Sequence, residues 1–462
     1  MWPSTSSVCR GLIDMESVAP PAAPSAGLTA GLAGWVAQLQ VDHLPPTAHS
    51  TLQRGMIDCA GVLLAGRDEE VVRHARALFQ IFPEHRPGLS RVLADRGWAD
   101  AAHAAMINVT AAHALDYDDT GLDGHPSVVL APVVTALAES LGCSKTQARC
   151  AYVAGYEVWA ELSERDEPRH GKGWHPTAVF GCVAAAAATA WMLGLDAERT
   201  RHALGLAASM SAGLVGNFGS MTKPLQVGWA AQNGILAGRL ARQGVTAAPD
   251  AIEGPRGLLV ALSPAGRPRL DGPPEVGVRW RIESSGLNIK RYPICYALHR
   301  ATDAALQLRE QLAGATPDHI AVRLGRQQVG MLRPGIPASA LDAKFSVPFA
   351  MACAFARGRV GLADLTDDAV HDPVIRQLMA RVEVLVWDAV DATEPLFSPH
   401  DEVLVTLADG LQVRSEPVTR ALGHASRPLD NQALRAKFLD CASATMAPEQ
   451  AQVWWDELTK ED

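Results

Sequence analysis

The hydrophobic positions between residues 27 and 272 recur every three or four residues, which is the spacing of amphipathic helices. Ser144 and Asp196 precede two of these runs as N-caps, and Gly142 and Gly244 follow the ends of two others. The pattern predicts helices over residues 28–39, 45–66, 100–114, 128–141, 145–162, 177–193, 196–211 and 230–243. We therefore expect a large all-helical domain in this region.

A different pattern begins near residue 273, where hydrophobic and polar residues alternate as they do in strands. The alternation predicts strands over residues 276–284, 319–326, 381–387 and 402–417, with helices at 296–313, 345–357 and 371–380 between them. Asp409-Gly410, within the last run, is a strong signal for a two-residue hairpin turn. Helical spacing resumes at Asn431.

Together these patterns predict a mainly α fold in which a smaller α+β lid is inserted into the helical domain. We expect a flexible tail in residues 1–26, the first part of the helical domain in 27–272, the lid in 273–420, and C-terminal helices in 421–462 that return to the helical domain. Binding sites often lie where two domains meet.

The composition excludes several classes of protein. The 462 residues are 48% hydrophobic and 20% charged, as in globular proteins. A net charge of −9 without a basic stripe argues against a nucleic-acid partner. The apolar run at residues 177–195 is rich in Ala and lacks a basic flank, so we expect a helix buried in protein and no membrane partner. Eight cysteines without a CxxC pair favour free thiols and a cytoplasmic location.

The segment HALDYDDTGLDGHPS, residues 113–127, concentrates four aspartates and two histidines in fifteen residues. Gly121 and Gly124 interrupt its helical spacing, so we expect a helix end that continues into a loop able to direct carboxylates and imidazoles into a cavity. Three interpretations stay open on residue types alone. They are acid–base catalysis, a metal site made of His and Asp ligands, and a solvated acidic loop with capping aspartates.

Three further segments carry groups that suit an anionic substrate. His175 precedes a proline at the expected start of a helix, and a helix N-terminus carries partial positive charge. Lys223 lies in a Gly/Ser-rich loop ahead of another proline, while Lys290 and Arg291 begin the segment KRYPICYALH. Each feature has an ordinary alternative, namely a structural histidine, a solvated lysine and surface salt bridges.

In order and wording, these segments resemble the MmgE/PrpD family. The shared motifs are HALDYDDT with HPS, GWHPTA, SMTKP with AAQNG, EG with GLL, KRYP with CYA, and AKFSVPFA, which together span about residues 30–440. That family includes 2-methylcitrate dehydratase, cis-aconitate decarboxylase and iminodisuccinate epimerase. The resemblance implies a helical domain with a smaller lid, a homodimer, a site between the two domains, and no metal or other cofactor.

The resemblance also implies which residues form the site. Matched position by position to the decarboxylases, the site holds Asp116, Thr120, His125, His175 and Lys223. Cys295 stands where the decarboxylases have a histidine, and Phe349 stands where they have a tyrosine, so two proton donors or hydrogen-bonding groups are replaced. We predict four catalytic residues, Asp116, His125, His175 and Lys223, and six substrate-binding residues, Thr120, Lys290, Arg291, Tyr292, Cys295 and His299.

The chemistry shared by the family is proton transfer at a carbon beside a carboxylate. Such a step needs positive groups that stabilise the carbanion in a site that excludes water. The sequence is therefore interpreted as a hydro-lyase similar to 2-methylcitrate dehydratase, acting on a small anionic di- or tricarboxylic acid. Three alternatives stay open: an epimerase of a substituted dicarboxylate such as iminodisuccinate, a decarboxylase of the cis-aconitate type, and an inactive paralogue that binds its ligand.

Overall fold

The computed structural model describes residues 27–95, 97–166, 172–333, 335–443 and 445–460, and the expected tail at residues 1–26 lies outside this part. The chain forms two compact units. The first contains the described residues up to Leu287 and from Leu434 onward, and the second contains Asn288–Ala433. The second unit therefore begins and ends later in the chain than the predicted range 273–420.

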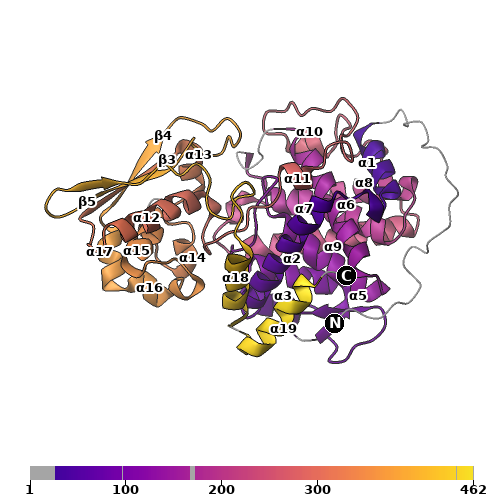
Figure 1. Ribbon diagram of the computed structural model, residues 1–462. Coiled ribbons are helices and arrows are strands. Elements are labelled where there is room, and N and C mark those ends of the chain that lie inside the picture. Colours follow the sequence, from indigo (N-terminus) through magenta and orange to yellow (C-terminus); the bar gives the residue numbers. More distant parts are fainter. Residues whose placement is uncertain (1–26, 96, 167–171, 334, 444, 461–462) are drawn as a thin grey trace. The chain divides into compact units, whose positions relative to one another are not determined.

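The first unit consists mainly of helices (Figure 1). Its helices are α1 (Leu28–Gln38), α2 (Pro46–Gly66), α3 (Glu70–Ala77), α4 (Ala101–Ala114), α5 (Pro126–Leu141), α6 (Lys145–Ser163), α7 (Pro176–Met192), α8 (Ala197–Met210), α9 (Thr222–Arg242), α10 (Leu258–Leu262), α11 (Arg281–Ser284), α18 (Asn431–Ser443), which starts just before the boundary, and α19 (Pro448–Thr459). Two short strands, β1 (Leu89–Val92) and β2 (Gly97–Asp100), form an antiparallel hairpin.

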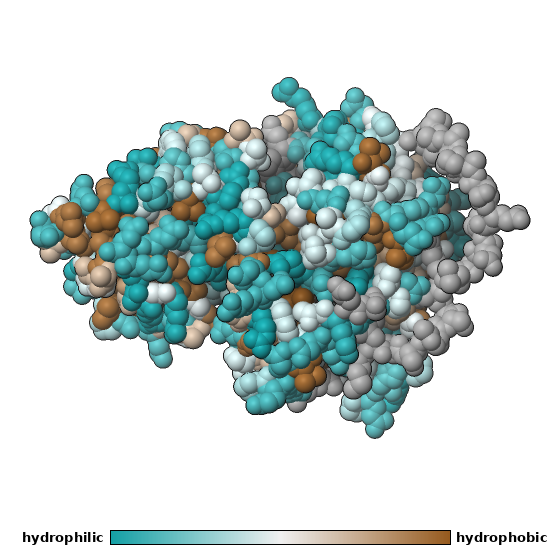
Figure 2. Space-filling view, viewed as in Figure 1, coloured by the Kyte–Doolittle hydropathy of each residue, from teal (hydrophilic) through white to brown (hydrophobic). Residues whose placement is uncertain are grey.

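Helix α7 lies in the interior of the first unit, where all 17 of its residues are buried. Its Ala-rich sequence is apolar on every side, which suits a helix surrounded by other helices. Helix α9 packs closely against it because Gly234 has no side chain; a Cβ there would lie 2.4 Å from Cβ of Ala185. Within the described residues, no helix combines the length and the apolar character that crossing a bilayer requires. The face drawn in Figure 2 is largely hydrophilic, with hydrophobic residues in small groups.

Two expectations for residues of the first unit are wrong, and one of them concerns a segment that the sequence assigns to the lid. The alternation at residues 276–284 predicts a strand, but the structure has turns followed by the short helix α11. Buried charge overrides the pattern, because Nη2 of the fully buried Arg281 lies 2.8 Å from Glu161 of α6 and 3.2 Å from Glu164, the residue that follows this helix. The unit is also not all-helical, since it contains the hairpin of β1 and β2; strands of four residues are too short for alternation to identify them.

The second unit is an α+β structure around one mixed sheet. Its strands are β3 (His319–Gly325), β4 (Val382–Trp387), β5 (Glu402–Thr406) and β6 (Gln412–Arg414), in the order β4-β3-β5-β6. Strand β3 is parallel to β4 and antiparallel to β5, with Val322 opposite both Val384 and Val403. The predicted hairpin is confirmed as β5 and β6, with Gly410 at φ 85° in its turn. The expected two-residue turn is wrong, because the N–H of Leu407 donates to the carbonyl of Leu411 and residues 408–410 form the connection.

Helices cover this sheet and complete the core of the second unit. They are α12 (His299–Gln311), α13 (Arg326–Met331), α14 (Ala340–Ala343), α15 (Val347–Arg357), α16 (Asp367–His371) and α17 (Pro373–Met379). Helices α12, α15 and α17 lie beside the sheet (Figure 1). Their residues share one hydrophobic core with β3, among them Leu308, Phe349 and Ile375. The predicted mainly α fold with a small sheet domain is confirmed, apart from the hairpin in the first unit.

Cysteine chemistry differs from expectation at one position. Six cysteines of the described residues are free thiols: Cys59, Cys150, Cys182, Cys295, Cys353 and Cys441. Cys143 is disulfide-bonded, so the expectation of free thiols throughout is wrong there. Burial raises the pKa of Cys182, in the interior helix α7, to about 12, which keeps that thiol protonated and unreactive.

Candidate active site

Four helix ends carry the histidines and the lysine of the candidate site. His113 lies in the last turn of α4, His125 immediately precedes α5, His175 immediately precedes α7, and Lys223 lies in the first turn of α9. A proline follows each of the last three, and proline is compatible with a first helical turn because its missing N–H would have no helical partner there. Lys223 is therefore on a helix and buried, not on the flexible loop that the sequence predicts.

The loop between α4 and α5 is held in a compact shape by its own backbone. Gly121 and Gly124 exchange two backbone hydrogen bonds of 2.9 and 2.8 Å. Nε1 of Trp159 donates to the carbonyl of Leu122 at 3.0 Å, and a Cβ on Gly124 would lie 2.8 Å from the same indole ring. Asp116 has φ 54°, a left-handed conformation that aspartate adopts more readily than most residues. These constraints bury the first aspartates of the loop and hold their side chains in place.

Asp118 lies between two imidazole rings. Its Oδ2 is 2.9 Å from Nδ1 of His113 and 2.9 Å from Nδ1 of His125. Nδ1 of His125 also faces the backbone carbonyl of Asp119 at 2.7 Å. Because both neighbours accept hydrogen bonds, Nδ1 of His125 carries the ring proton, and a neutral His125 has its lone pair on Nε2.

His175 carries its proton on the other ring nitrogen. Oε1 of Gln226 accepts the N–H of Leu214 at 3.0 Å, which fixes the orientation of this amide. Its Nε2 then donates to Nδ1 of His175 at 2.7 Å, so a neutral His175 holds its proton on Nε2. The ring of His175 stacks on His113 at a centroid distance of 5.8 Å and meets Phe218 edge-on at 4.8 Å. The site thus offers one imidazole that can accept a proton and one that can donate a proton.

Lys223 supplies a buried positive charge to the same site. Its Nζ lies 2.5 Å from Oδ1 of Asp116 and 5.1 Å from the centroid of the Phe218 ring. The same Asp116 oxygen is 4.0 Å from Nε2 of His125. One carboxylate therefore lies between the lysine and the basic nitrogen of the histidine, in a buried setting where charges interact strongly.

Burial and neighbouring charge set the protonation states of the loop. Burial lowers the pKa of His113 to about 4, although the carboxylate of Asp118 opposes this shift. Burial alone would raise the pKa of Asp118, but His113 and His125 outweigh it and hold the pKa well below its usual range. Burial, assisted by Asp58, raises the pKa of Asp119, which accepts the N–H of Ser127 at the start of α5. Of these two neighbouring aspartates, Asp118 is therefore the one whose carboxylate stays charged.

Several buried polar atoms of this region lack a hydrogen-bond partner among the described residues. They are Nε2 of His113, Oδ1 of Asp118, Oγ1 of Thr120 and Oγ1 of Thr177. Buried polar atoms are nearly always paired, so these atoms are suited to a polar ligand. Thr120 and the four predicted catalytic residues all belong to the first unit.

The donor set also suits a divalent cation. One ligand atom each from His113, Asp116, Asp118 and His125 lies within 4.8 Å of the others. However, Asp118 already receives two imidazole N–H groups, and Asp116 already receives the ammonium of Lys223. A metal would have to displace these partners, so the residues fit a proton-transfer site better than a metal centre.

The other five predicted site residues belong to the second unit: Lys290, Arg291, Tyr292, Cys295 and His299. That they share one site with the residues of the first unit stays a prediction. Lys290 is buried. Nη1 of Arg291 lies 3.5 Å from Oδ1 of Asp303, and the hydroxyl of Tyr292 donates to the same oxygen at 2.6 Å. These contacts give Arg291 and Tyr292 a structural role within their own unit.

Cys295 precedes a short 3-10 turn, Tyr296–Leu298, and His299 is the first residue of α12. Cys295 is a half-buried free thiol, and His299 is fully buried. The imidazole of His299 lies 5.1 Å from the ring centroids of both Tyr292 and Tyr296. Its Nε2 is 3.3 Å from the carbonyl of Ile294. This aromatic packing favours a structural histidine.

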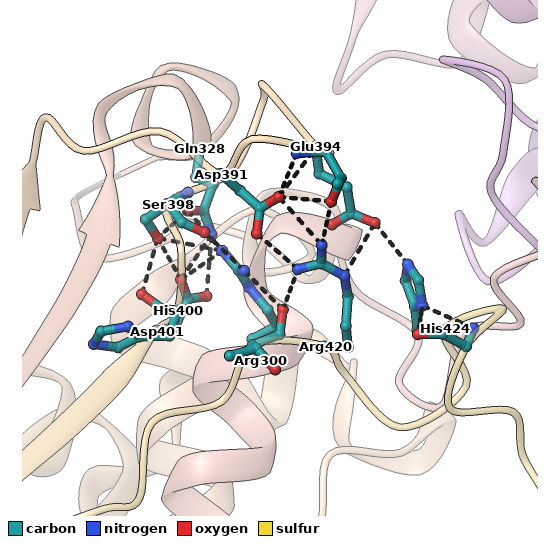
Figure 3. Close-up of polar contacts among 12 residues, drawn as sticks. Arg300, Gln328, Asp391, Glu394, Ser398, His400, Asp401, Arg420 and His424 are labelled. Atoms are coloured by element: carbon teal, nitrogen blue, oxygen red, sulfur yellow. Dashed lines mark hydrogen bonds and ion pairs between the residues drawn. The ribbon is translucent and has the colours of Figure 1, made fainter.

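Hydrogen bonds hold the segment that carries Lys290 against a neighbouring loop, which is itself fixed by charged groups. Residues 288–289 form hydrogen bonds with residues 423–425, which brings the two segments side by side. Nε2 of His424 lies 2.6 Å from Oε1 of Glu394, and Nε of Arg420 lies 3.6 Å from the same oxygen (Figure 3). The position of Lys290 within the second unit is therefore fixed by the loop that precedes α18.

Sequence reasoning did not assign three residues that the geometry brings into the site: His113, Asp118 and Gln226. His113 and Asp118 were visible within the acidic motif, five residues apart across a helix end. Gln226 follows Lys223 by three residues, so it lies one helical turn further along α9. That spacing was a usable signal, but nothing in the sequence indicates that His175 is its partner.

Comparison with known proteins adds a family. The MmgE/PrpD N-terminal domain matches residues 30–271, and the MmgE/PrpD C-terminal domain matches residues 292–460. Cis-aconitate decarboxylase of Mus musculus is 28% identical over 447 residues, covering 92% of this chain and 88% of that protein. The enzymes of that name from Homo sapiens and Aspergillus terreus are 26% and 25% identical, each over about nine-tenths of both chains. The resemblance read from the motifs is confirmed.

Proposed function

The chain belongs to the MmgE/PrpD family, and we propose that it is a lyase that removes a proton from a carbon beside a carboxylate of a small di- or tricarboxylic acid. One observation carries the proposal. In the neutral rings, Nε2 is unprotonated in the half-buried His125 and protonated in the buried His175, and both rings lie in the site that contains the buried Lys223. Its relatives named cis-aconitate decarboxylase support a lyase. The proposed reaction needs no metal or other cofactor.

In this mechanism His125 is the base. Its Nε2 accepts the proton of the substrate carbon, and the ring becomes an imidazolium. Asp118, whose charge is maintained in the buried loop, stabilises that imidazolium through Nδ1, as a buried carboxylate does in other His-dependent enzymes.

Positive groups stabilise the negative charge that the carbon leaves on its carboxylate. Lys223 is the ammonium of the first unit, and the N-terminus of α7, next to His175, adds partial positive charge. The carboxylate of the substrate competes with Asp116 for Lys223, so Asp116 holds the lysine in place until the substrate arrives.

In a dehydration, the pair of electrons from the broken C–H bond forms the new C=C bond as the neighbouring C–O bond breaks. Nε2–H of His175 gives its proton to the departing hydroxide, which leaves as water, and the neutral ring becomes an imidazolate until a proton returns to it. Exchange with solvent then removes the proton from His125 and returns one to His175, so the step is balanced without an oxidant or reductant.

We propose dehydration as the reaction that the protein catalyses, and decarboxylation is the second candidate. Phe349 is fully buried in the hydrophobic core of the second unit, and Cys295 is a half-buried thiol. Neither offers the hydrogen-bonding group that the resemblance assigns to the decarboxylases at these positions. The names of the relatives favour decarboxylation.

Proton exchange in D₂O separates these reactions. The protein is incubated with citrate-like acids, cis-aconitate and substituted dicarboxylates, and the products are followed by NMR. We expect alkene signals from a citrate-like acid. Released carbon dioxide would instead identify a decarboxylase, deuterium without loss of water an epimerase, and an unchanged spectrum with every acid would reject catalysis in favour of a binding protein.

We also propose that the protein is a homodimer. Trp229, Leu236 and Leu240 lie on one face of α9 and expose 43%, 36% and 39% of their surface. Exposed apolar stripes of this kind often mark protein interfaces. Light scattering should give twice the mass of the chain, and Trp229→Glu should lower that mass; a monomeric parent protein would contradict the proposal.

A further inference from the structure

Lys437 of helix α18 places its ammonium group in the interior of the first unit. The side chain of Lys437 is 5% exposed, and its Nζ lies 2.6 Å from Oδ1 of Asp58 on α2, whose side chain is fully buried. The same Nζ donates to the backbone carbonyl of Tyr117 at 2.8 Å and lies 3.9 Å from the centroid of the Tyr117 ring. Lys437 thus contacts both the backbone and the ring of one residue of the active-site loop.

Tyr117 is the residue between the two aspartates on which the site depends. Its carbonyl belongs to the same planar peptide unit as the N–H of Asp118, so a donor that fixes this carbonyl also fixes the direction in which the chain enters Asp118. On its other side, Asp116 has φ 54°, a conformation that needs support from its surroundings. A rotation of this peptide would move both carboxylates.

We propose that Lys437 is a positioning residue of the active site, which sets the carboxylates of Asp116 and Asp118 against Lys223 and the two imidazoles through the carbonyl of Tyr117. Asp58 makes the arrangement possible because its carboxylate compensates the buried ammonium. This inference rests on the proposed roles of Asp118 and His125.

A purely structural ion pair predicts a different outcome from a positioning residue. Removing one partner of a buried pair is costly because the other charge is left uncompensated, whereas replacing both with neutral groups is often tolerated. If the pair only stabilises the fold, a variant that neutralises both residues should recover activity as it recovers stability. If Lys437 positions the loop, a variant with both residues neutralised should recover stability but not activity, because the carbonyl of Tyr117 still lacks its hydrogen-bond donor.

The experiment compares four variants of the full chain: Lys437→Met, Asp58→Asn, the double variant, and Lys437→Arg. Thermal unfolding, kcat and KM are measured for each with whichever acid the parent protein converts. We expect Lys437→Met to unfold at a lower temperature than the double variant. We expect the double variant to keep a kcat at least about tenfold below the parent with KM within about threefold, since small displacements of catalytic groups act on turnover. Lys437→Arg, which retains a charged donor, should recover part of kcat.

A double variant with the kcat of the parent protein would overturn the inference. A second measurement keeps this result separate from the proposed reaction, because it needs no substrate. In protein labelled with ¹⁵N-histidine, the Nδ1–H signals of His113 and His125 report their contacts with Asp118. If no acid is converted by the parent protein, the proposed function fails, but shifted signals in the double variant still support the positioning role, and unchanged signals reject it.

Discussion

Oδ2 of Asp118 lies 2.9 Å from Nδ1 of His125, and this contact fixes both the orientation and the tautomer of the ring. An asparagine has the same shape but cannot stabilise the imidazolium that forms during proton removal. Asp118→Asn should therefore lower kcat at least about 100-fold while the protein remains folded. Steady-state kinetics and circular dichroism provide the measurement.

Asp119→Asn is the matched control for that substitution. Asp119 is the adjacent buried aspartate, but its pKa is raised, so the amide resembles its neutral form and can still accept the N–H of Ser127. We expect a loss of kcat below about tenfold, since the charge that supports catalysis is retained in Asp118. Equal losses in the two variants would contradict the role given to Asp118.

Lys223→Met removes the buried ammonium that opposes the charge of the carbanion. Turnover should fall at least about 100-fold, as it does when one preorganised charge is lost from a transition state. Lys460→Met, at an exposed position, should leave both turnover and the melting temperature unchanged. Full activity of Lys223→Met would remove the lysine from the mechanism.

Gln226→Glu tests the protonation assigned to His175. A carboxylate in place of the amide would accept a hydrogen bond from Nδ1 and so draw the proton away from Nε2, where the mechanism needs it. We expect kcat to fall at least about tenfold with a smaller change in KM. Gln226→Met, which neither donates nor accepts strongly, should have an intermediate effect, and the reverse order of the two variants would contradict the assignment.

His113 should make stability depend on pH in a defined window. Its folded pKa is about 4 and its unfolded value about 6.5, so between these values the unfolded chain binds a proton that the folded protein lacks. Stability from this group is complete above pH 6.5 and declines as pH falls towards 4, by about 3 kcal/mol at about 1.4 kcal/mol per pKa unit.

The measurement is the difference in free energy of unfolding between the parent protein and His113→Gln from pH 7 to pH 4. A difference is needed because burial raises the pKa of Glu157 to about 7 and that of Asp401 to about 6, and these carboxyls act in the opposite direction. The difference should decline as pH falls. A constant difference would show that His113 does not titrate as described.

Chelation tests the choice between a proton-transfer site and a metal centre. Dialysis against EDTA should leave turnover unchanged, because Lys223 and the two imidazoles occupy the acceptors that a divalent cation would need. Lost activity that Zn²⁺ or Mn²⁺ restores would falsify the metal-independent mechanism and assign the cation to His113, Asp116, Asp118 and His125.

Local patterns were sufficient for most of the fold because hydrophobic spacing determines which face of an element is buried. The strands at residues 319–326 and 381–387 and the interior helix α7 were predicted in this way. The strand prediction for residues 276–284 was wrong because alternation does not reveal that Arg281 is paired with two distant carboxylates, those of Glu161 and Glu164.

The candidate site was predictable to the extent that its residues cluster in the sequence. The acidic motif pointed to Asp116 and His125, but not to Asp118 as the shared partner of two rings, since such a contact depends on how a helix end meets a loop. Lys437 could not be found from the sequence, because 320 residues separate it from Tyr117 and a lone lysine on an amphipathic helix has no distinguishing pattern.

The contact between Lys437 and Tyr117 also has a consequence for biosynthesis. A ribosome completes the histidines and Lys223 long before it reaches Lys437, and the entire second unit, Asn288–Ala433, is translated in between. The nascent polypeptide therefore lacks the donor for the Tyr117 carbonyl while its helical portion is already outside the exit tunnel. Catalytic competence should therefore emerge only after Lys437 has been synthesised.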